Sequence, residues 1–213
     1  MAAVNGGDTC PTLLSRLERQ LQLAPRCTLQ GSRRAAVCAV CRDGDDGDCE
    51  VLFIHRAEDP RDPWSGHMAF PVGRVDANDR SPLNAAIREA REELGIDLEE
   101  RARLIGHLSD VTAVARGRRL GLIIEPFVFK LLHPVRICPN EEVQDVLWIP
   151  LDFFLESANR STLQYRYDTA TIALPCYRYR SKVVWGLTLR MIDELLSLVT
   201  GFRPNDWPTF DHR

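Results

Sequence analysis

The sequence has no long apolar run, no excess of basic side chains and no repeated segment. No apolar stretch approaches the about 20 residues that a membrane-spanning helix needs, so we expect no membrane partner. A formal net charge of -3 gives no sign of a nucleic-acid-binding surface. The N-terminus lacks the basic start and apolar core of a secretory signal, and Asp8 argues against a mitochondrial transit peptide. We therefore expect a cytoplasmic protein, with organellar targeting left open.

Cysteine is present in an odd number, which speaks against a framework of paired disulfides. The 7 cysteines are scattered along the chain, as free thiols in a reducing compartment would be. Cys38 and Cys41 form a C-x-x-C pair that zinc or redox chemistry could use, but no second pair stands at ligand spacing. Both lie in an apolar, strand-like run, so we favour buried structural thiols.

One helix with clear end signals is predicted in the first half of the chain. Ser81 suits the capping position, Pro82 the first helical position, and Gly95 the position just past the end. Between them an apolar stripe recurs at helical spacing, formed by Leu83, Ile87, Ala90 and Leu94.

A second face of this helix is acidic. Glu89, Glu92 and Glu93 stand at i, i+3 and i+4, so they project from the same side. The plain interpretation is a solvated helix face on which Arg88 and Arg91 offset the repulsion. The alternative is a binding site for a hard divalent cation, because clustered carboxylate oxygens suit Mg²⁺ or Mn²⁺.

The residues around this helix follow a known pattern. Phe70-Pro71-Val72-Gly73 leads through a polar loop into the helix, and the whole string resembles the Nudix hydrolase signature G-x5-E-x7-R-E-U-x-E-E-x-G-U, where U is bulky and apolar. Residues 88–96, R-E-A-R-E-E-L-G-I, match its distal half at each fixed position, with the small Ala90 as the weakest match. The proximal half departs, because Gly73 and Arg88 are separated by one residue more than in the signature and Asp79 replaces the first Glu.

The resemblance implies an α/β fold, the Nudix-type α/β/α sandwich with a mixed sheet between helices. It also implies a metal-dependent hydrolase that cleaves the pyrophosphate bond of a nucleoside diphosphate linked to another moiety. In such an enzyme Glu89, Glu92 and Glu93 would ligate Mg²⁺ or Mn²⁺, and the Gly73 carbonyl would add a ligand. Divalent ions neutralise pyrophosphate oxygens and so favour attack by water. Arg88 would orient a helix carboxylate rather than touch substrate.

The resemblance further implies a general base, which some branches of the family place in a distant loop. Glu142 in the segment Asn140-Glu141-Glu142-Val143 is our candidate, with Glu141 second. We assign catalytic roles to Glu92, Glu93 and Glu142. Two alternatives stay open: the loop acids are simply exposed, or a Glu of the helix itself is the base.

The segment from His55 to Asp76 resembles the branch of the family that cleaves coenzyme A. There an R-x-(several)-H-x-G-x-x-S-F-P-G-G block precedes the signature. By this resemblance Arg56, Phe70 and Arg74 bind substrate. The expected small-molecule nucleotide is coenzyme A or acyl-coenzyme A, split into 4'-phosphopantetheine and 3',5'-adenosine bisphosphate.

The chain departs from that block at three positions: Trp64 replaces the His, Ala69 the Ser, and Val72 the first Gly of the pair. A β-branched residue resists backbone angles that Gly allows, so the Val72 change matters most. Two other functions therefore stay open: an ADP-ribose or dinucleotide pyrophosphatase, or a catalytically weak nucleotide-binding module.

The rest of the chain is compatible with this fold. We expect an N-terminal helical extension at residues 1–31, a Nudix hydrolase domain at 32–202 and a C-terminal tail at 203–213. The sequence leaves open whether the protein forms a homodimer. Residues 116–119 form a basic loop that either meets an anionic substrate or is a solvated turn. Strands are expected at residues 35–41, 51–56, 67–70, 103–109, 120–132 with a break at Pro126, 143–149, 163–167 and 171–177, and further helices at 12–23, 150–157 and 185–199.

Overall fold

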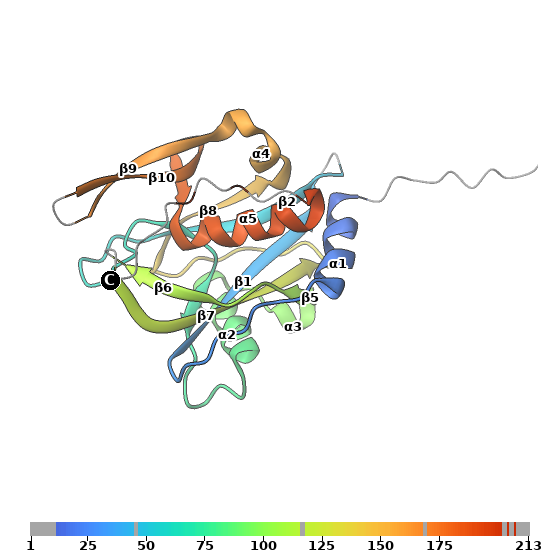
Figure 1. The fold of residues 1–213 in the computed structure, drawn as a ribbon. Helices are drawn as coiled ribbons and strands as arrows, with labels where there is room; N and C mark the ends of the chain where they lie inside the picture. Colours follow the sequence, from blue (N-terminus) through green and yellow to red (C-terminus); the bar gives the residue numbers. More distant parts are fainter. Residues whose placement is uncertain are drawn as a thin grey trace, which may run out of the picture.

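A mixed β-sheet lies at the centre of the fold, with helices on both faces (Figure 1). The computed structural model describes residues 12–44, 47–115, 118–167, 170–201, 204 and 207. Strand β1 (Arg34–Asp43) runs parallel to β7 (Arg118–Leu131) and antiparallel to β2 (Cys49–Arg56). The order β3-β2-β1-β7-β5 ends at β3 (Met68–Ala69) on one side and β5 (Ala102–His107) on the other.

Three further strands pair with the inner strands of this order. β4 (Val72–Arg74) pairs with β1, β6 (Val111–Ala115) pairs with β7, and β8 (Val143–Pro150) pairs with β2. β4 places the start of the signature segment directly beside the central strand.

The sheet is covered on both faces, which is why residues 35–41 of β1 are all buried. Side chains that alternate along a strand point to opposite faces, so β1 contributes to two cores. One core includes side chains of α1 (Leu13–Leu23), α4 (Leu151–Leu155) and α5 (Gly186–Thr200), and the other includes side chains of α2 (Pro82–Leu94) and α3 (Leu98–Arg101). The predicted α/β/α sandwich is confirmed. Cys38 and Cys41 fall in different cores and are both buried, as expected of structural thiols.

A second, three-stranded sheet follows the first in the chain. After α4 and the short 3-10 turn at Ser157–Asn159, β9 (Arg160–Tyr167) and β10 (Ala170–Tyr179) form the predicted hairpin, and β11 (Lys182–Trp185) adds to it. Figure 1 shows this sheet beside α5 and apart from the main one. Within the described residues no helix combines the length and apolarity needed to cross a membrane.

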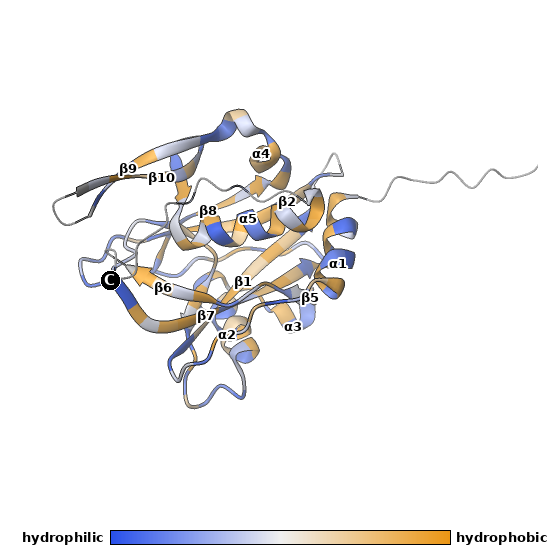
Figure 2. Ribbon diagram, in the orientation of Figure 1, coloured by the Kyte–Doolittle hydropathy of each residue, from blue (hydrophilic) through white to orange (hydrophobic). Residues whose placement is uncertain are grey.

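The N-terminal helix α1 belongs to the main core. Leu14, Leu17 and Leu21 are buried with α5, and Arg16 donates a hydrogen bond from Nη2 to the Val199 carbonyl at 2.8 Å. Figure 2 shows α1 and α5 with both apolar and polar residues, as amphipathic helices have. Residues 12–23 therefore cover the sheet rather than form a separate lobe.

Several predicted boundaries are wrong. β7 continues through Pro126 without a break, and Trp185 ends β11 instead of beginning the last helix. Of the predicted basic loop, Arg118 and Arg119 belong to β7 and pair with Ala115 and Val114, whereas residues 116 and 117 lie outside the described part of the chain. The short elements β4, α3, β6 and β11 were not predicted.

Candidate active site

Helix α2 begins and ends where its sequence predicts. The Ser81 hydroxyl accepts a hydrogen bond from the Asn84 amide at 3.3 Å, Pro82 occupies the first turn, and Gly95 ends the helix in the left-handed conformation with φ 68°. The apolar side of the helix packs on the sheet through Ala85, Ala86, Ala90 and Leu94. The acidic side is therefore held in a fixed orientation next to β4.

Glu93 is the most buried of the three acids, with 1% of its surface exposed. Its Oε2 accepts a hydrogen bond from the Val72 amide at 3.2 Å, and its Oε1 lies 3.6 Å from Nη1 of Arg56. Among the described residues Oε1 has no hydrogen-bond partner. Burial raises the pKa of Glu93 to about 8, against the opposing effect of the Arg56 guanidinium. A buried acceptor without a partner is costly, and a bound cation would remove that cost.

Glu89 lies directly over Gly73 of β4. A Cβ atom at position 73 would stand 1.8 Å from Oε1 of Glu89, so only glycine leaves this space free. Burial raises the pKa of Glu89. The Gly73 backbone and the Glu89 carboxylate are thereby brought together, as the sequence predicts.

Glu92 is half-exposed, and Arg88 links it to Glu89. Nη1 of Arg88 donates to Glu89 Oε1 at 2.6 Å and to Glu92 Oε2 at 2.9 Å. The other end of the guanidinium binds the Arg74 carbonyl and the Asp79 carboxylate, each at 3.0 Å. Arg88 therefore forms the expected salt bridge and also anchors the loop before α2.

Asp79 thus acts as the partner of Arg88. The guanidinium lowers the pKa of Asp79 and keeps it ionised. Asp79 is the residue that replaces the first Glu of the signature, and the structure shows that its shorter side chain still reaches the arginine.

Glu142 lies in the loop that precedes β8, and that loop is tied to the end of α2. The Cys138 and Asn140 amides donate to the Leu94 and Glu93 carbonyls at 2.8 and 3.0 Å. The negative charge of Glu142 contributes to the raised pKa values of Glu89 and Glu93. Glu141 and Glu142 line a hollow of about 650 Å³ beside the loop after β2, and Arg56 and Asp62 line both this hollow and the cavity described below.

The three helix acids do not converge on one point. Arg88 holds two of them and Glu93 turns towards Arg56. Within the part of the chain that the structure describes, no three acidic, histidine or cysteine side chains are arranged to hold a metal ion as they stand. The oxygen-rich donor set and the Glu93 oxygen, which has no hydrogen-bond partner among the described residues, nonetheless suit a hard divalent cation.

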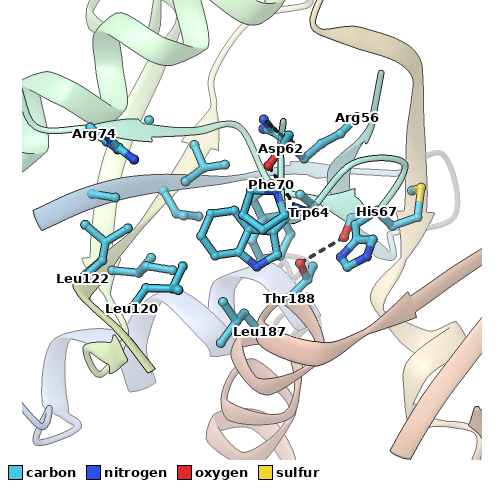
Figure 3. Close-up of a pocket in the computed structure, with 18 of the residues that line it drawn as sticks. Arg56, Asp62, Trp64, His67, Phe70, Arg74, Leu120, Leu122, Leu187 and Thr188 are labelled. Atoms are coloured by element: carbon cyan, nitrogen blue, oxygen red, sulfur yellow. Dashed lines mark hydrogen bonds and ion pairs between the residues drawn. The ribbon is translucent and has the colours of Figure 1, made fainter. Parts of the chain in front are cut away.

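A cavity of about 570 Å³ opens beside β4. All three residues predicted to bind substrate, Arg56, Phe70 and Arg74, line it. In Figure 3, Trp64 and Phe70 lie between Arg74 and the Arg56–Asp62 pair, with leucines of β7 and α5 nearby. The apolar part of the wall comes from Leu120, Leu122, Ile124, Leu187 and Met191. The charged part comes from Arg33 and Arg74 and from two ion pairs, Arg56 with Asp62 and Arg61 with Asp59. Such a wall suits an anionic group joined to an apolar or aromatic one.

Sequence reasoning missed Asp62 and treated Trp64 only as a departure from the family pattern. Asp62 accepts hydrogen bonds from Arg56 Nε at 2.8 Å and from the Trp64 amide at 2.9 Å, and Trp64 forms part of the cavity wall. The D-P-W-S-G string did carry a signal, because an Asp two residues before an amide commonly forms this turn.

Comparison with known proteins identifies the family. The family model described as NUDIX domain matches residues 32–167. Nudix hydrolase NudL of Pectobacterium atrosepticum is 31% identical over 182 residues, covering 83% of this chain and 88% of that protein. The chain belongs to the Nudix hydrolase family.

Other relatives are similar over smaller parts of their length. The peroxisomal coenzyme A diphosphatase of Caenorhabditis elegans is 33% identical over 149 residues, which cover 68% of this chain and 61% of that protein. The chain spans 55% of the chloroplastic Nudix hydrolase 22 of Arabidopsis thaliana, to which it is 27% identical. The crystal structure of a MutT/nudix family protein from Enterococcus faecalis shares the fold, with a TM-score of 0.55, 16% identity, and coverage of 84% of this chain and 66% of that one.

Proposed function

We propose that this protein hydrolyses the pyrophosphate bond of a nucleoside diphosphate linked to another moiety, with coenzyme A or acyl-coenzyme A as substrate. The observation that carries the proposal is the buried Oε1 of Glu93, which has no hydrogen-bond partner among the described residues and lies on a Nudix helix beside a cavity lined by arginines and apolar side chains. The similarity to a coenzyme A diphosphatase supports the choice of substrate.

Glu89, Glu92 and Glu93, with the Gly73 carbonyl, would hold Mg²⁺ or Mn²⁺. When bound, such an ion would neutralise diphosphate oxygens and make water a better nucleophile. Arg56 and Arg74 would bind phosphate oxygens from the cavity wall. Glu142, with Glu141 or a helix Glu as alternatives, would accept a proton from the attacking water.

The products follow from attack of water on the diphosphate. One P–O bond of the bridging oxygen breaks, one P–O bond to the water oxygen forms, and each half of the substrate leaves as a phosphomonoester. For coenzyme A these halves are 4'-phosphopantetheine and 3',5'-adenosine bisphosphate.

A panel of diphosphate metabolites, incubated with Mg²⁺ or Mn²⁺ and followed by mass spectrometry, tests the proposal. We expect coenzyme A or its acyl esters to be turned over fastest. Glu92→Gln and Glu93→Gln should each lower kcat by orders of magnitude. Glu99→Gln is the matched control, because Glu99 is an exposed glutamate of α3 and should leave the rate unchanged. If both site variants hydrolysed substrate at the wild-type rate, Glu92 and Glu93 would have no role in the reaction.

A second candidate is a nucleotide-binding module with weak catalysis. The salt bridges of Arg88 to both Glu89 and Glu92 favour it, since these carboxylates must be released before they can ligate a cation. Tight nucleotide binding without metal-dependent turnover on the same panel would support this candidate. If ADP-ribose or a dinucleotide were hydrolysed faster than coenzyme A, the protein would instead belong to another branch of the family.

A further inference from the structure

Asp62 is one of the side chains that hold the loop between β2 and β3, together with Asp59 and Ser65. Its Oδ2 accepts a hydrogen bond from Nε of Arg56 at 2.8 Å and forms an ion pair with Nη2 of the same guanidinium at 2.8 Å. Its Oδ1 accepts one from the Trp64 amide at 2.9 Å, and its carbonyl accepts one from the Ser65 amide at 3.2 Å. Asp62 therefore sets both the direction of Arg56 and the course of the loop that carries Trp64.

The position of Arg56 leaves Glu93 unsatisfied. Nη1 of Arg56 stops 3.6 Å from Glu93 Oε1, beyond the about 3.2 Å of an ordinary N–H···O bond. A guanidinium that was free to move would close this gap, because charge-assisted bonds between arginine and carboxylate form at about 2.7–2.9 Å. The two contacts from Arg56 to Asp62 lie on the other side of the guanidinium and oppose that movement.

We propose that Asp62 is a positioning residue that holds Arg56 back from Glu93 and so keeps Glu93 Oε1 available to a divalent cation. The inference rests on the proposed function, since it assumes that Glu93 is a ligand. Asp62 favours cation binding although its own carboxylate does not need to touch the ion. Loss of its charge would let Arg56 bind Glu93 and compete with the cation.

A purely structural role of Asp62 predicts a different result. If Asp62 only stabilised its turn, any defect would come from the loop and would persist after removal of Arg56. If it restrains Arg56, removal of the arginine would cancel the defect. Asp97 offers a matched control, because its Oδ2 binds Arg91 at 2.6 Å and its Oδ1 accepts the amide two residues on, at 3.1 Å, away from the cavity.

The test measures Mn²⁺ binding to the full chain by electron paramagnetic resonance, without substrate. We expect Asp62→Asn to weaken Mn²⁺ binding about tenfold, in the range found when residues that support metal ligands are changed. The double variant Asp62→Asn with Arg56→Met should return to nearly the wild-type affinity, and Asp97→Asn should leave it unchanged. Asp62→Ser, which keeps a side-chain oxygen for the Trp64 amide, should repeat the Asp62→Asn result if that variant folds poorly.

Wild-type affinity in both Asp62 variants overturns the inference, and so does a double variant as weak as Asp62→Asn alone. These results are separate from a failure of the proposed function. If wild-type protein bound no Mn²⁺ and turned over no diphosphate, both proposals would fall. If it bound and hydrolysed normally while the Asp62 variants matched it, only the role of Asp62 would be lost.

Discussion

Burial of the Glu93 carboxyl group links the stability of the fold to pH. The pKa of this group is about 8 in the folded protein, well above the about 4.3 of a free glutamate. Between these values the folded state holds a proton that the unfolded state has lost. Stability must therefore fall as pH rises through this window, until the folded group ionises as well.

Glu93→Gln should remove this dependence. In the presence of a chelator, the free energy of unfolding of the wild type should fall between pH 5 and pH 8.5 by on the order of a few kcal/mol more than that of the variant. Urea denaturation at both pH values measures the difference. Parallel behaviour of the two proteins would show that the buried carboxyl does not carry the pH dependence.

Gly73→Ala tests the close approach of β4 to Glu89. The added Cβ would overlap the end of the Glu89 side chain, which can move away, and the backbone at position 73 is not in the left-handed region. We expect a fold of nearly wild-type stability and a loss of about 10–100-fold in kcat/KM, as for displaced metal ligands. Thermal unfolding and steady-state kinetics measure the two effects. An active variant would argue against a role for this contact.

The sequence predicts which side chains share a face of helix α2, but it does not predict how deeply each of them is buried. The acidic face of α2 follows from spacing alone, whereas the burial of Glu93 and the exposure of Glu92 depend on β4 and Arg56. Val72 was expected to strain the backbone. It lies in a β-strand without a positive φ, where a β-branched residue is well suited.

Helix α2 is an element whose ends are set locally. Ser81→Ala removes the side-chain acceptor of the Asn84 amide and should cost about 1 kcal/mol of stability, whereas Ser81→Asn keeps an acceptor and should cost less. Chemical denaturation of both variants provides the comparison. Equal losses would mean that the cap contributes little to this helix.

The elements that sequence reasoning missed depend on partners distant in the chain. β4 has three residues and exists because β1 pairs with it. Pro126 was expected to break β7 because proline lacks an amide donor. It lies where the neighbour of β7 changes from β6 to β5, and its carbonyl bonds the Leu108 amide at 2.9 Å. The N–H and C=O of a strand residue point to the same side of the strand. The amide hydrogen that Pro126 lacks would therefore point into the gap between β5 and β6, where no strand pairing is lost.

At the scale of the whole molecule, α1 closes the core on one face of the sheet. Leu17→Ala should destabilise the protein by about 2–5 kcal/mol, because the Leu17 side chain is fully buried. Leu23→Ala, on the same helix but 72% exposed, is the matched control and should change stability little. Urea denaturation followed by tryptophan fluorescence measures both. Similar small effects would show that α1 packs loosely.

The three-layer plan of the molecule was predictable from the family signature, although the order of strands and helices alone did not single it out. The second sheet and the packing of α1 on α5 were not, since they depend on surfaces that only the assembled chain brings together.

The contact between α1 and α5 also sets the order in which the newly made chain can fold. The leucine face of α1 leaves the ribosome well before α5, its partner in the folded core. At translation rates of roughly 5–20 residues per second, that face stays uncovered for on the order of ten seconds. Until α5 is made, this leucine face has no helix partner to shield it from water.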